Sequence, residues 1–260
     1  LIGSKFSPPL SIFIFGLLGI SFLAASAAVI NHIFDSEIDA KMNRTASRPL
    51  VKGSITEFSA SVFAAALYVS GSLMLLIYVN ALTWILTSLT FIFYAFIYTR
   101  YLKFMTSQNI VIGGLAGAMP PLLGWTAVSN TIEPNAWLLV LIVMVWTPPH
   151  FWALAVYRVD DYAEAAVPML PVQKGIAFTK QHIVLYTLLL LASTMLPYAV
   201  GMFQELYLVV ALILGLGFLY FSIKLYRDDT NASAMQTFAY SISYLAALFG
   251  AMLVDQYLYL

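Results

Sequence analysis

Residues 58–99 read FSASVFAAALYVSGSLMLLIYVNALTWILTSLTFIFYAFIYT, an apolar stretch without a single charged side chain. A membrane-spanning helix needs about 20 apolar residues, so this stretch is long enough to cross a bilayer twice. Asn80 lies near its middle and interrupts the apolar pattern. The stretch therefore predicts two membrane helices joined by a short hairpin at Asn80.

The rest of the chain has the same organisation. Further stretches without charged residues run over 6–34, 104–132, 134–157, 181–204, 206–223 and 230–254. Together with the hairpin they predict eight spans, near 10–33, 57–78, 81–100, 109–129, 135–157, 180–201, 205–226 and 234–256. Only helices and closed β-barrels satisfy backbone hydrogen bonds in lipid, and these segments are too long for barrel strands. The predicted fold class is therefore an all-α, polytopic transmembrane helix bundle, with residues 1–260 forming one domain.

The overall composition agrees with a membrane protein. The chain has 260 residues, of which 62% are hydrophobic and 9% charged, and its mean hydropathy is +0.88. A soluble domain carries roughly a quarter charged residues, so the solvent of this chain is largely lipid. The formal net charge is zero, which argues against a nucleic-acid partner. The absence of cysteine excludes disulfides and thiolate metal sites.

The basic residues predict the orientation of the bundle. Eight spans place every Lys and Arg except Lys5 on the same side of the membrane. Basic residues are enriched in cytoplasmic loops, so this side is cytoplasmic, or faces the matrix in a mitochondrion. The loops on this side are long and charged, whereas the outer connections are short, which places function at the cytoplasmic end.

The first charged segment follows the first span. Asn31, Asp35 and Asp39 are spaced by four residues, so a helix places all three on one face, with His32 beside them. Carboxylates at the membrane boundary are energetically costly and usually mark function. They are hard oxygen ligands of the kind Mg²⁺ uses together with phosphate oxygens. The cations that follow, Arg44, Arg48 and Lys52, suit a diphosphate group. The alternative is a solvated loop with ordinary helix-end charges.

The second charged segment, residues 147–171, follows the fifth span. Asp160, Asp161 and Glu164 lie at helical spacing at the cytoplasmic end of that span. Two acidic clusters, each after a helix four spans from the other, predict paired metal sites that face one another across the bundle. Either Asp160 or Asp161 can be the key ligand, and we favour Asp161.

Two further features have alternative interpretations. Small residues at 113, 114, 117 and 118 either allow close helix packing or leave room for a flat ligand, and Pro120 and Pro121 are expected to break that helix. His150 lies inside an apolar span and is either a hydrogen-bonded interior residue or a ligand contact, including a haem axial ligand. His182 is expected to be structural.

These motifs resemble those of the UbiA prenyltransferase superfamily. NHIFDSEIDAKMNRTASRPLV (31–51) contains the family pattern NxxxDxxxD, which in that family binds diphosphate through Mg²⁺. QNIVIGGLAGAMPPLLGW (108–125) and WTPPHFWALAVYRVDDYAEAAVPMLPV (146–172) resemble the haem-farnesylating branch of the family. The resemblance covers nearly the whole chain. Because the family has nine spans and the chain begins at Leu1 rather than Met, we expect a further span before Leu1.

The resemblance implies transfer of farnesyl from farnesyl diphosphate to a vinyl group of haem b, with addition of water. The implied metal ligands are Asn31, Asp35, Asp39, Asp160, Asp161 and Glu164. The implied catalytic residues are Asp35, Asp39, Asp161 and Arg48. The implied substrate-binding residues are Asn31, His32, Arg44, Lys52, Tyr98, Arg100, Asn109, His150, Trp152, Tyr157, Arg158 and Lys174. Among these, the rings of Tyr98, Trp152 and Tyr157 are expected to stabilise an allylic cation, and His150 to contact haem.

Two other functions were weighed. The first is a UbiA-type transferase acting on a quinone precursor or a chlorophyllide. The second is an ion-coupled secondary transporter, which is disfavoured because a transporter places its acids near the bilayer midplane rather than at one surface. The compact loops favour a bacterial plasma membrane. A handoff of product to a downstream haem-modifying or oxidase-assembly protein would fit the implied reaction.

Overall fold

The computed structural model describes residues 8–42 and 45–259, and all regular structure in these ranges is helical. The elements are α1 (Leu10–Phe34), α2 (Ser36–Asp39), α3 (Glu57–Tyr78), α4 (Ala81–Ile92), the π-helix η1 (Phe93–Leu102), α5 (Lys103–Met105), α6 (Asn109–Ala118), α7 (Pro120–Ser129), α8 (Pro134–Tyr157), α9 (Val159–Glu164), α10 (Leu170–Lys174), α11 (Ile176–Ala199), α12 (Glu205–Arg227) and α13 (Ala234–Leu258). Within the described residues, eight helical segments are long and apolar enough to cross a membrane: α1, α3, α4 to α5, α6 to α7, α8, α11, α12 and α13. The predicted all-α bundle of eight spans is confirmed.

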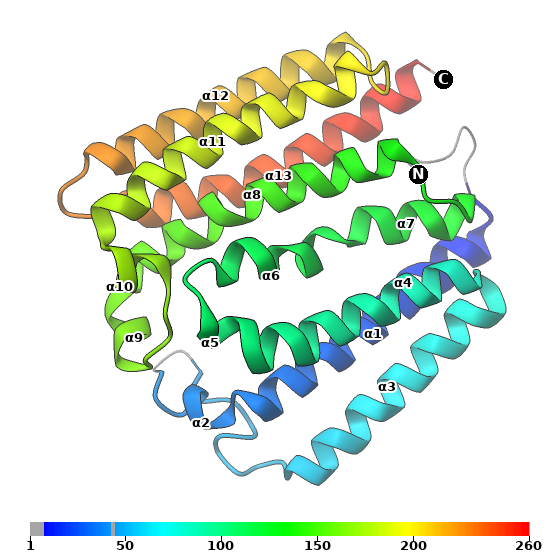
Figure 1. Cartoon of the computed structure of the whole chain (residues 1–260). Helices are drawn as coiled ribbons and strands as arrows, with labels where there is room; N and C mark the ends of the chain where they lie inside the picture. Colours follow the sequence, from blue (N-terminus) through cyan, green and yellow to red (C-terminus); the bar gives the residue numbers. More distant parts are fainter. Residues whose placement is uncertain (1–7, 43–44, 260) are drawn as a thin grey trace.

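The spans form two groups joined through α8. Helix α8 packs against α11 and α13 on one side and against α6 on the other, while α1 packs mainly against α3 (Figure 1). The short helices α2, α5, α9 and α10 all lie at the same end of the bundle, opposite the C-terminal end of α13 (Figure 1). We call this the charged end, because it carries both acidic segments of the sequence.

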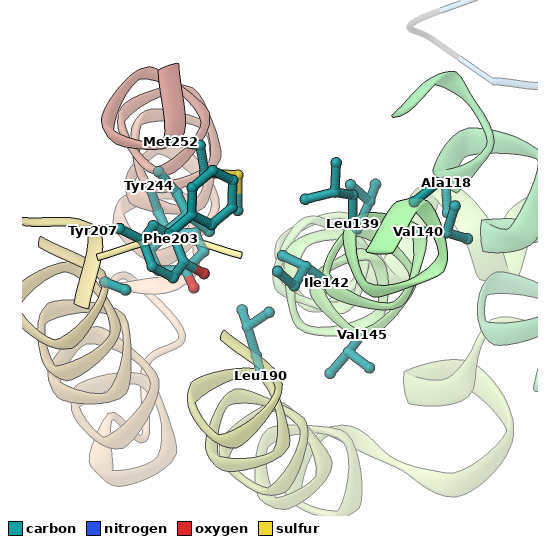
Figure 2. Close-up of a cluster of buried hydrophobic side chains, with 14 of the residues drawn as sticks. Ala118, Leu139, Val140, Ile142, Val145, Leu190, Phe203, Tyr207, Tyr244 and Met252 are labelled. Carbon is teal, nitrogen blue, oxygen red and sulfur yellow. The ribbon is translucent and has the colours of Figure 1, made fainter. Parts of the chain in front are cut away.

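The main hydrophobic core surrounds α8. Ile142 of α8, Leu190 of α11 and Tyr244 of α13 are almost completely buried and face a common interior (Figure 2). A second cluster lies at the charged end and joins Met42, which follows α2, to Tyr162 of α9. This second cluster ties the loop after the first acidic motif to the helix that carries the second motif.

Two predicted interruptions are present. Asn80 precedes α4, where its side chain accepts a hydrogen bond from the Thr83 backbone N–H (2.8 Å) and donates to the Thr126 carbonyl (2.9 Å). Helix α6 ends at Ala118 and α7 begins at Pro120, because a proline cannot donate the next helical hydrogen bond. The Asn80 hairpin and the proline break are both confirmed.

Two predicted boundaries were wrong by four or five residues: the span expected at 81–100 continues to Met105, and the span expected at 180–201 begins earlier. The span expected at 180–201 is helix α11, which begins at Ile176 immediately after Gly175, a glycine with a φ of 87°. Lys180 lies inside this helix and is buried, and its ammonium donates to the backbone carbonyl of Asp228. The charge of Lys180 therefore led to a helix start that was predicted too late, because this charge is satisfied by a backbone carbonyl inside the protein.

The side chain of Asp228 stabilises the turn between α12 and α13. Its carboxylate accepts hydrogen bonds from the Ser233 hydroxyl (2.6 Å) and the Thr230 hydroxyl (2.6 Å). These hydrogen bonds hold the pKa of the Asp228 carboxyl below its usual range. The turn between α12 and α13 is thus closed by one carboxylate.

A buried carboxylate at the opposite end gives a stability prediction. Asp255 of α13 is 1% exposed and accepts from the backbone N–H groups of Gln204 (2.8 Å) and Tyr207 (3.0 Å), so it caps the start of α12. Asp255→Ala leaves these donors without an acceptor and should lower the free energy of unfolding by about 1–3 kcal/mol. Thermal unfolding in detergent measures this, and Asp255→Asn, which keeps one acceptor oxygen, should lose less. Equal stability of the wild type and Asp255→Ala would contradict the capping role.

Candidate active site

The first acidic motif forms a compact polar cluster at the charged end. Helix α1 ends at Phe34, but helical backbone hydrogen bonding continues, from Asp35 N–H to the Asn31 carbonyl (2.9 Å) and from Asp39 N–H to the Asp35 carbonyl (2.8 Å). Asn31 donates through Nδ2 to Asp35 Oδ2 (2.9 Å). The structure therefore places the Asn31 and Asp35 side chains together on one helical face, as their spacing predicted.

Each carboxylate of this motif is paired with a cation. Lys103 Nζ lies 2.7 Å from Asp35 Oδ2, and Arg48 Nη1 pairs with Asp39 Oδ2. Both carboxylates are almost fully buried, at 4% exposed each. A buried carboxylate without a partner is strongly destabilising, so these cations are what makes the site stable when no metal is bound.

Lys103 was not among the residues predicted from the sequence, and the local backbone explains why. In an α-helix, residues nine apart lie on opposite sides, since nine residues make two and a half turns. In a π-helix with about 4.4 residues per turn, nine residues make roughly two turns. Tyr94 lies in the first turn of the π-helix η1 and Lys103 directly follows its last residue, and both face α1.

Arg100, which was predicted to bind substrate, lies outside the cluster. Arg100 is exposed, and its guanidinium lies 5.4 Å from the centre of the Phe34 ring. Thr99 faces inward instead, where its hydroxyl accepts from Asn31 Nδ2 (3.1 Å) and donates to the Tyr94 carbonyl (2.8 Å). The cation that the structure brings to Asp35 is therefore Lys103 and not Arg100.

The remaining basic candidates are not fixed in the cluster. Arg44 lies outside the described residues. Lys52 and Lys174 are exposed, and no ion pair involving either is present in the described part of the chain. His32 is half-buried near the end of α1. Among the described residues, His32 lies within electrostatic range of Asp35 and Asp39.

The second acidic motif is more open than the first. Asp161 is half-buried and pairs with Arg158, whose Nη1 lies 3.0 Å from Asp161 Oδ2. Asp160 and Glu164 are exposed. Within residues 8–42 and 45–259, no three His, Asp or Glu side chains are grouped closely enough to hold a metal ion. The expected second metal site at Asp160, Asp161 and Glu164 is therefore not assembled in this structure.

The first motif nevertheless fits Mg²⁺. Mg²⁺ in phosphate-binding sites takes one or two carboxylates and completes its octahedral shell with water and phosphate oxygens. Asp35 and Asp39 provide two carboxylates on consecutive helical turns, and Asn31 provides an amide oxygen beside them. The donor set is suited to a metal–diphosphate complex rather than to a metal ion held by protein ligands alone.

Apolar cavities lead away from this cluster into the bundle. One of about 300 Å³ lies between α1, η1 and α6, and its lining includes Tyr94 and Gly117. A second, of about 510 Å³, lies between α1, α7 and α13. The two share Ile20, Ala24 and Pro120 in their walls. We call the two cavities together the apolar passage; Tyr94 lines the smaller one.

The glycines of α6 have different roles, which settles the alternative left open by the sequence. A Cβ on Gly113 would overlap the Tyr98 ring, and one on Gly114 would lie 3.0 Å from Thr147. Gly117, in contrast, faces open space and lines the smaller cavity. Gly113 and Gly114 therefore serve packing, whereas Gly117 leaves room in the cavity.

Two tyrosines lie between the polar cluster and the cavity. The rings of Tyr94 and Tyr98 are stacked, with centres 5.7 Å apart, and both lie within electrostatic range of Asp35. Tyr94 was missed by the sequence interpretation. Its spacing of four residues from Tyr98 was the available signal.

Three further predicted substrate-binding residues, Trp152, Tyr157 and Asn109, are not part of the polar cluster. Trp152 is completely buried between α8 and α11, against Tyr186 and His182, and its expected contact with a reacting cation stays a prediction. Tyr157 is 54% exposed on the outer surface and contacts Arg158. Asn109 has no exposed surface and donates to the Lys103 carbonyl (3.0 Å), so it positions the backbone that carries Lys103.

Two similar proteins by sequence are protoheme IX farnesyltransferases. The chain is 54% identical over 250 residues to the protoheme IX farnesyltransferase of Saccharophagus degradans and 55% identical over 250 residues to that of Alcanivorax borkumensis. Each alignment covers 96% of this chain and 82% of the relative. Such similarity extends over all the motifs described above.

Solved structures share the fold. A structure of digeranylgeranylglyceryl phosphate synthase matches with a TM-score of 0.79 at 21% identity, covering 98% of this chain and 89% of the other. A UbiA homolog from Archaeoglobus fulgidus bound to GPP and Mg²⁺ matches with a TM-score of 0.67 at 14% identity, covering 95% of this chain and 89% of the other. The family model of the UbiA prenyltransferases matches residues 1–249. The chain belongs to the UbiA prenyltransferase family.

Proposed function

We propose that this chain is a protoheme IX farnesyltransferase that joins the farnesyl group of farnesyl diphosphate to a vinyl group of haem b, with the whole chain acting as one catalytic domain. The supporting observation is the similarity of 54% and 55% identity to two enzymes of that name, across 96% of the chain. The geometry supports the proposal, because Tyr94 lines an apolar cavity and also lies within electrostatic range of Asp35, which pairs with Lys103.

The diphosphate binds at the first acidic motif. Asn31, Asp35 and Asp39 would hold Mg²⁺, which when bound supplies Lewis-acid stabilisation of the leaving diphosphate. Lys103 and Arg48 hold the two carboxylates in the free protein and are placed to contact diphosphate oxygens when the donor arrives. Preorganised cations of this kind stabilise negative charge that develops in the transition state.

The farnesyl chain lies in the apolar passage. Its walls of alanine, leucine and glycine exclude water from the reactive carbon and contact the isoprene units. The stacked Tyr94 and Tyr98 rings lie between this passage and the carboxylates, where their faces can stabilise positive charge on the allylic carbon as the carbon–oxygen bond breaks.

Haem b is the acceptor. A new carbon–carbon bond forms between the farnesyl C1 and the terminal vinyl carbon, water supplies a hydroxyl to the inner vinyl carbon, and one proton is released. Arg158, paired with Asp161 at the charged end, is a candidate partner for a propionate. The charged end would face the cytoplasm of a bacterial plasma membrane, and product would pass to a downstream haem-modifying or oxidase-assembly protein.

Gly117 provides a test of the donor passage. Gly117→Leu places a large side chain into the smaller cavity and should reduce turnover with farnesyl diphosphate at least about tenfold, with a smaller effect on a shorter allylic diphosphate. The matched control is Gly250→Leu, because Gly250 also faces open space but lines neither cavity. Steady-state kinetics with both donors measures the effect. An equal loss with both donors, or in both variants, would be evidence against this passage as the farnesyl site.

Competition between acceptors tests the function itself. Membranes containing the protein would receive farnesyl diphosphate, Mg²⁺, haem b and an aromatic acid together, with each prenylated product identified by mass. Prenylation of haem and not of the acid supports the proposal. Prenylation of the acid alone would favour the alternative transferase and refute the haem assignment.

A further inference from the structure

His150 of α8 is held between two aromatic rings. The Trp146 ring stacks on it with centres 4.2 Å apart and an interplanar angle of 18°, and the Phe238 ring of α13 stacks at 4.5 Å and 25°. Two rings stacked this closely on one imidazole must cover its opposite faces. The ring can neither tilt nor rotate without disturbing the packing between α8 and α13.

Ser241 of α13 fixes the protonation of this ring. The Ser241 hydroxyl lies 2.6 Å from His150 Nδ1 and donates its single hydrogen to the Phe238 carbonyl (2.5 Å). It must therefore accept from Nδ1, which carries the proton. The Ser241 carbonyl accepts from the Trp146 indole (2.8 Å), so the same residue also anchors one of the stacking rings.

The opposite nitrogen, Nε2, is left with an unprotonated lone pair. It makes no hydrogen bond to any described residue, and it is not among the fully enclosed polar atoms that lack a partner. It is therefore not fully enclosed, although the residue as a whole is only 8% exposed. A neutral imidazole with a fixed Nδ1–H and an open Nε2 is the form that binds a transition metal.

We propose that His150 Nε2 is an axial ligand of the iron of haem b, and that Ser241 is the positioning residue that fixes its tautomer and orientation. The inference rests on the proposed function, since it assigns a contact to the haem substrate. A histidine nitrogen is a common protein ligand of haem iron, and the hydrogen bond at the other nitrogen sets ligand direction and basicity.

Ligation of the iron by His150 would orient the porphyrin ring of haem b. His150 lies eight residues before Arg158 on α8, which corresponds to about 12 Å along the helix. Iron ligation at His150 therefore leaves the propionates free to reach the charged end. Iron ligation also distinguishes haem b from the iron-free porphyrin, which has the same vinyl and propionate groups.

The test is a binding titration of the purified protein in lipid nanodiscs, followed by absorption and magnetic circular dichroism. Wild type should bind haem b with the spectrum of imidazole-ligated iron. His150→Ala should lose that spectrum and regain it when free imidazole is added, while its affinity for iron-free protoporphyrin IX stays unchanged. Ser241→Ala should weaken haem affinity by about 10- to 100-fold, again without changing affinity for the iron-free porphyrin.

The controls separate ligation from a structural role. His182→Ala should retain the imidazole-ligated spectrum, because His182 lies on α11 against Phe178 and Trp152 and not in the contact between α8 and α13 that holds His150. An unchanged iron spectrum in His150→Ala, or equal losses for haem and iron-free porphyrin, would overturn the proposal.

Turnover distinguishes failure of this inference from failure of the function. Wild type that farnesylates haem without an imidazole-ligated spectrum would refute the ligand assignment and leave the proposed function intact. Wild type that neither binds nor farnesylates haem, yet prenylates another acceptor, would refute both.

Discussion

Asp35→Ala should lower kcat/KM for farnesyl diphosphate by about a thousandfold or more. The substitution removes one of two carboxylates available to Mg²⁺ and releases Lys103 and Asn31 from the positions they now hold. Loss of one preorganised group at a developing charge costs about 10²- to 10³-fold, and loss of the metal costs more. Initial rates at several Mg²⁺ concentrations measure the effect, and excess Mg²⁺ should restore part of the activity.

The matched control is Glu37→Ala. Glu37 lies two residues away on α2, carries the same charge and is exposed. It should retain near wild-type turnover. Because Asp35→Ala leaves Lys103 without its partner, the double variant Asp35→Asn/Lys103→Met should recover thermal stability but not activity. A fully active Asp35→Ala would contradict the role of this motif in donor binding.

Lys103→Met should reduce turnover by about a hundredfold, with the larger part of the loss in apparent affinity for farnesyl diphosphate. Methionine fills a similar volume without the charge, so the loss reports the contact between the ammonium and the diphosphate. Binding of the donor measured by isothermal titration, together with kcat and KM, separates binding from chemistry.

Arg100→Met is the control for Lys103 because it tests the register of the π-helix. Both residues are basic and lie three positions apart, but Arg100 is exposed and lies over Phe34. Arg100→Met should change turnover less than about threefold, as expected for an exposed charge. A larger loss in Arg100→Met than in Lys103→Met would contradict the assignment of Lys103 as the cation that binds the donor.

The arrangement of spans was predictable because charge is so rare in this chain. Most of the long charge-free stretches are close to one bilayer thickness, 58–99 is close to two, and Asn80 marks the break within it. Lys180 is an exception to the rule that a charged residue marks the end of a span. A buried ammonium satisfied by a backbone carbonyl lies inside a helix, although its charge alone suggests a boundary.

Site residues could be predicted from the sequence where regular helical spacing brings them together. They could not be predicted where the backbone departs from an α-helix. Asn31 and Asp35 meet because four residues make about one helical turn. Lys103 could not be predicted because periodicity arguments assume an α-helix, and η1 changes the register of everything after Phe93. The neighbours of Trp152 could not be predicted because the sequence does not show which helix each face of α8 meets, and this face meets α11.

The direct test of the account is a turnover assay in membranes supplied with haem b, farnesyl diphosphate and Mg²⁺, with the porphyrin product followed by mass. The account predicts a farnesylated and hydrated haem that forms with wild type, requires Mg²⁺ and disappears in Asp35→Ala. Wild type that leaves haem b unchanged under these conditions, while releasing diphosphate in the presence of another acceptor, would contradict it.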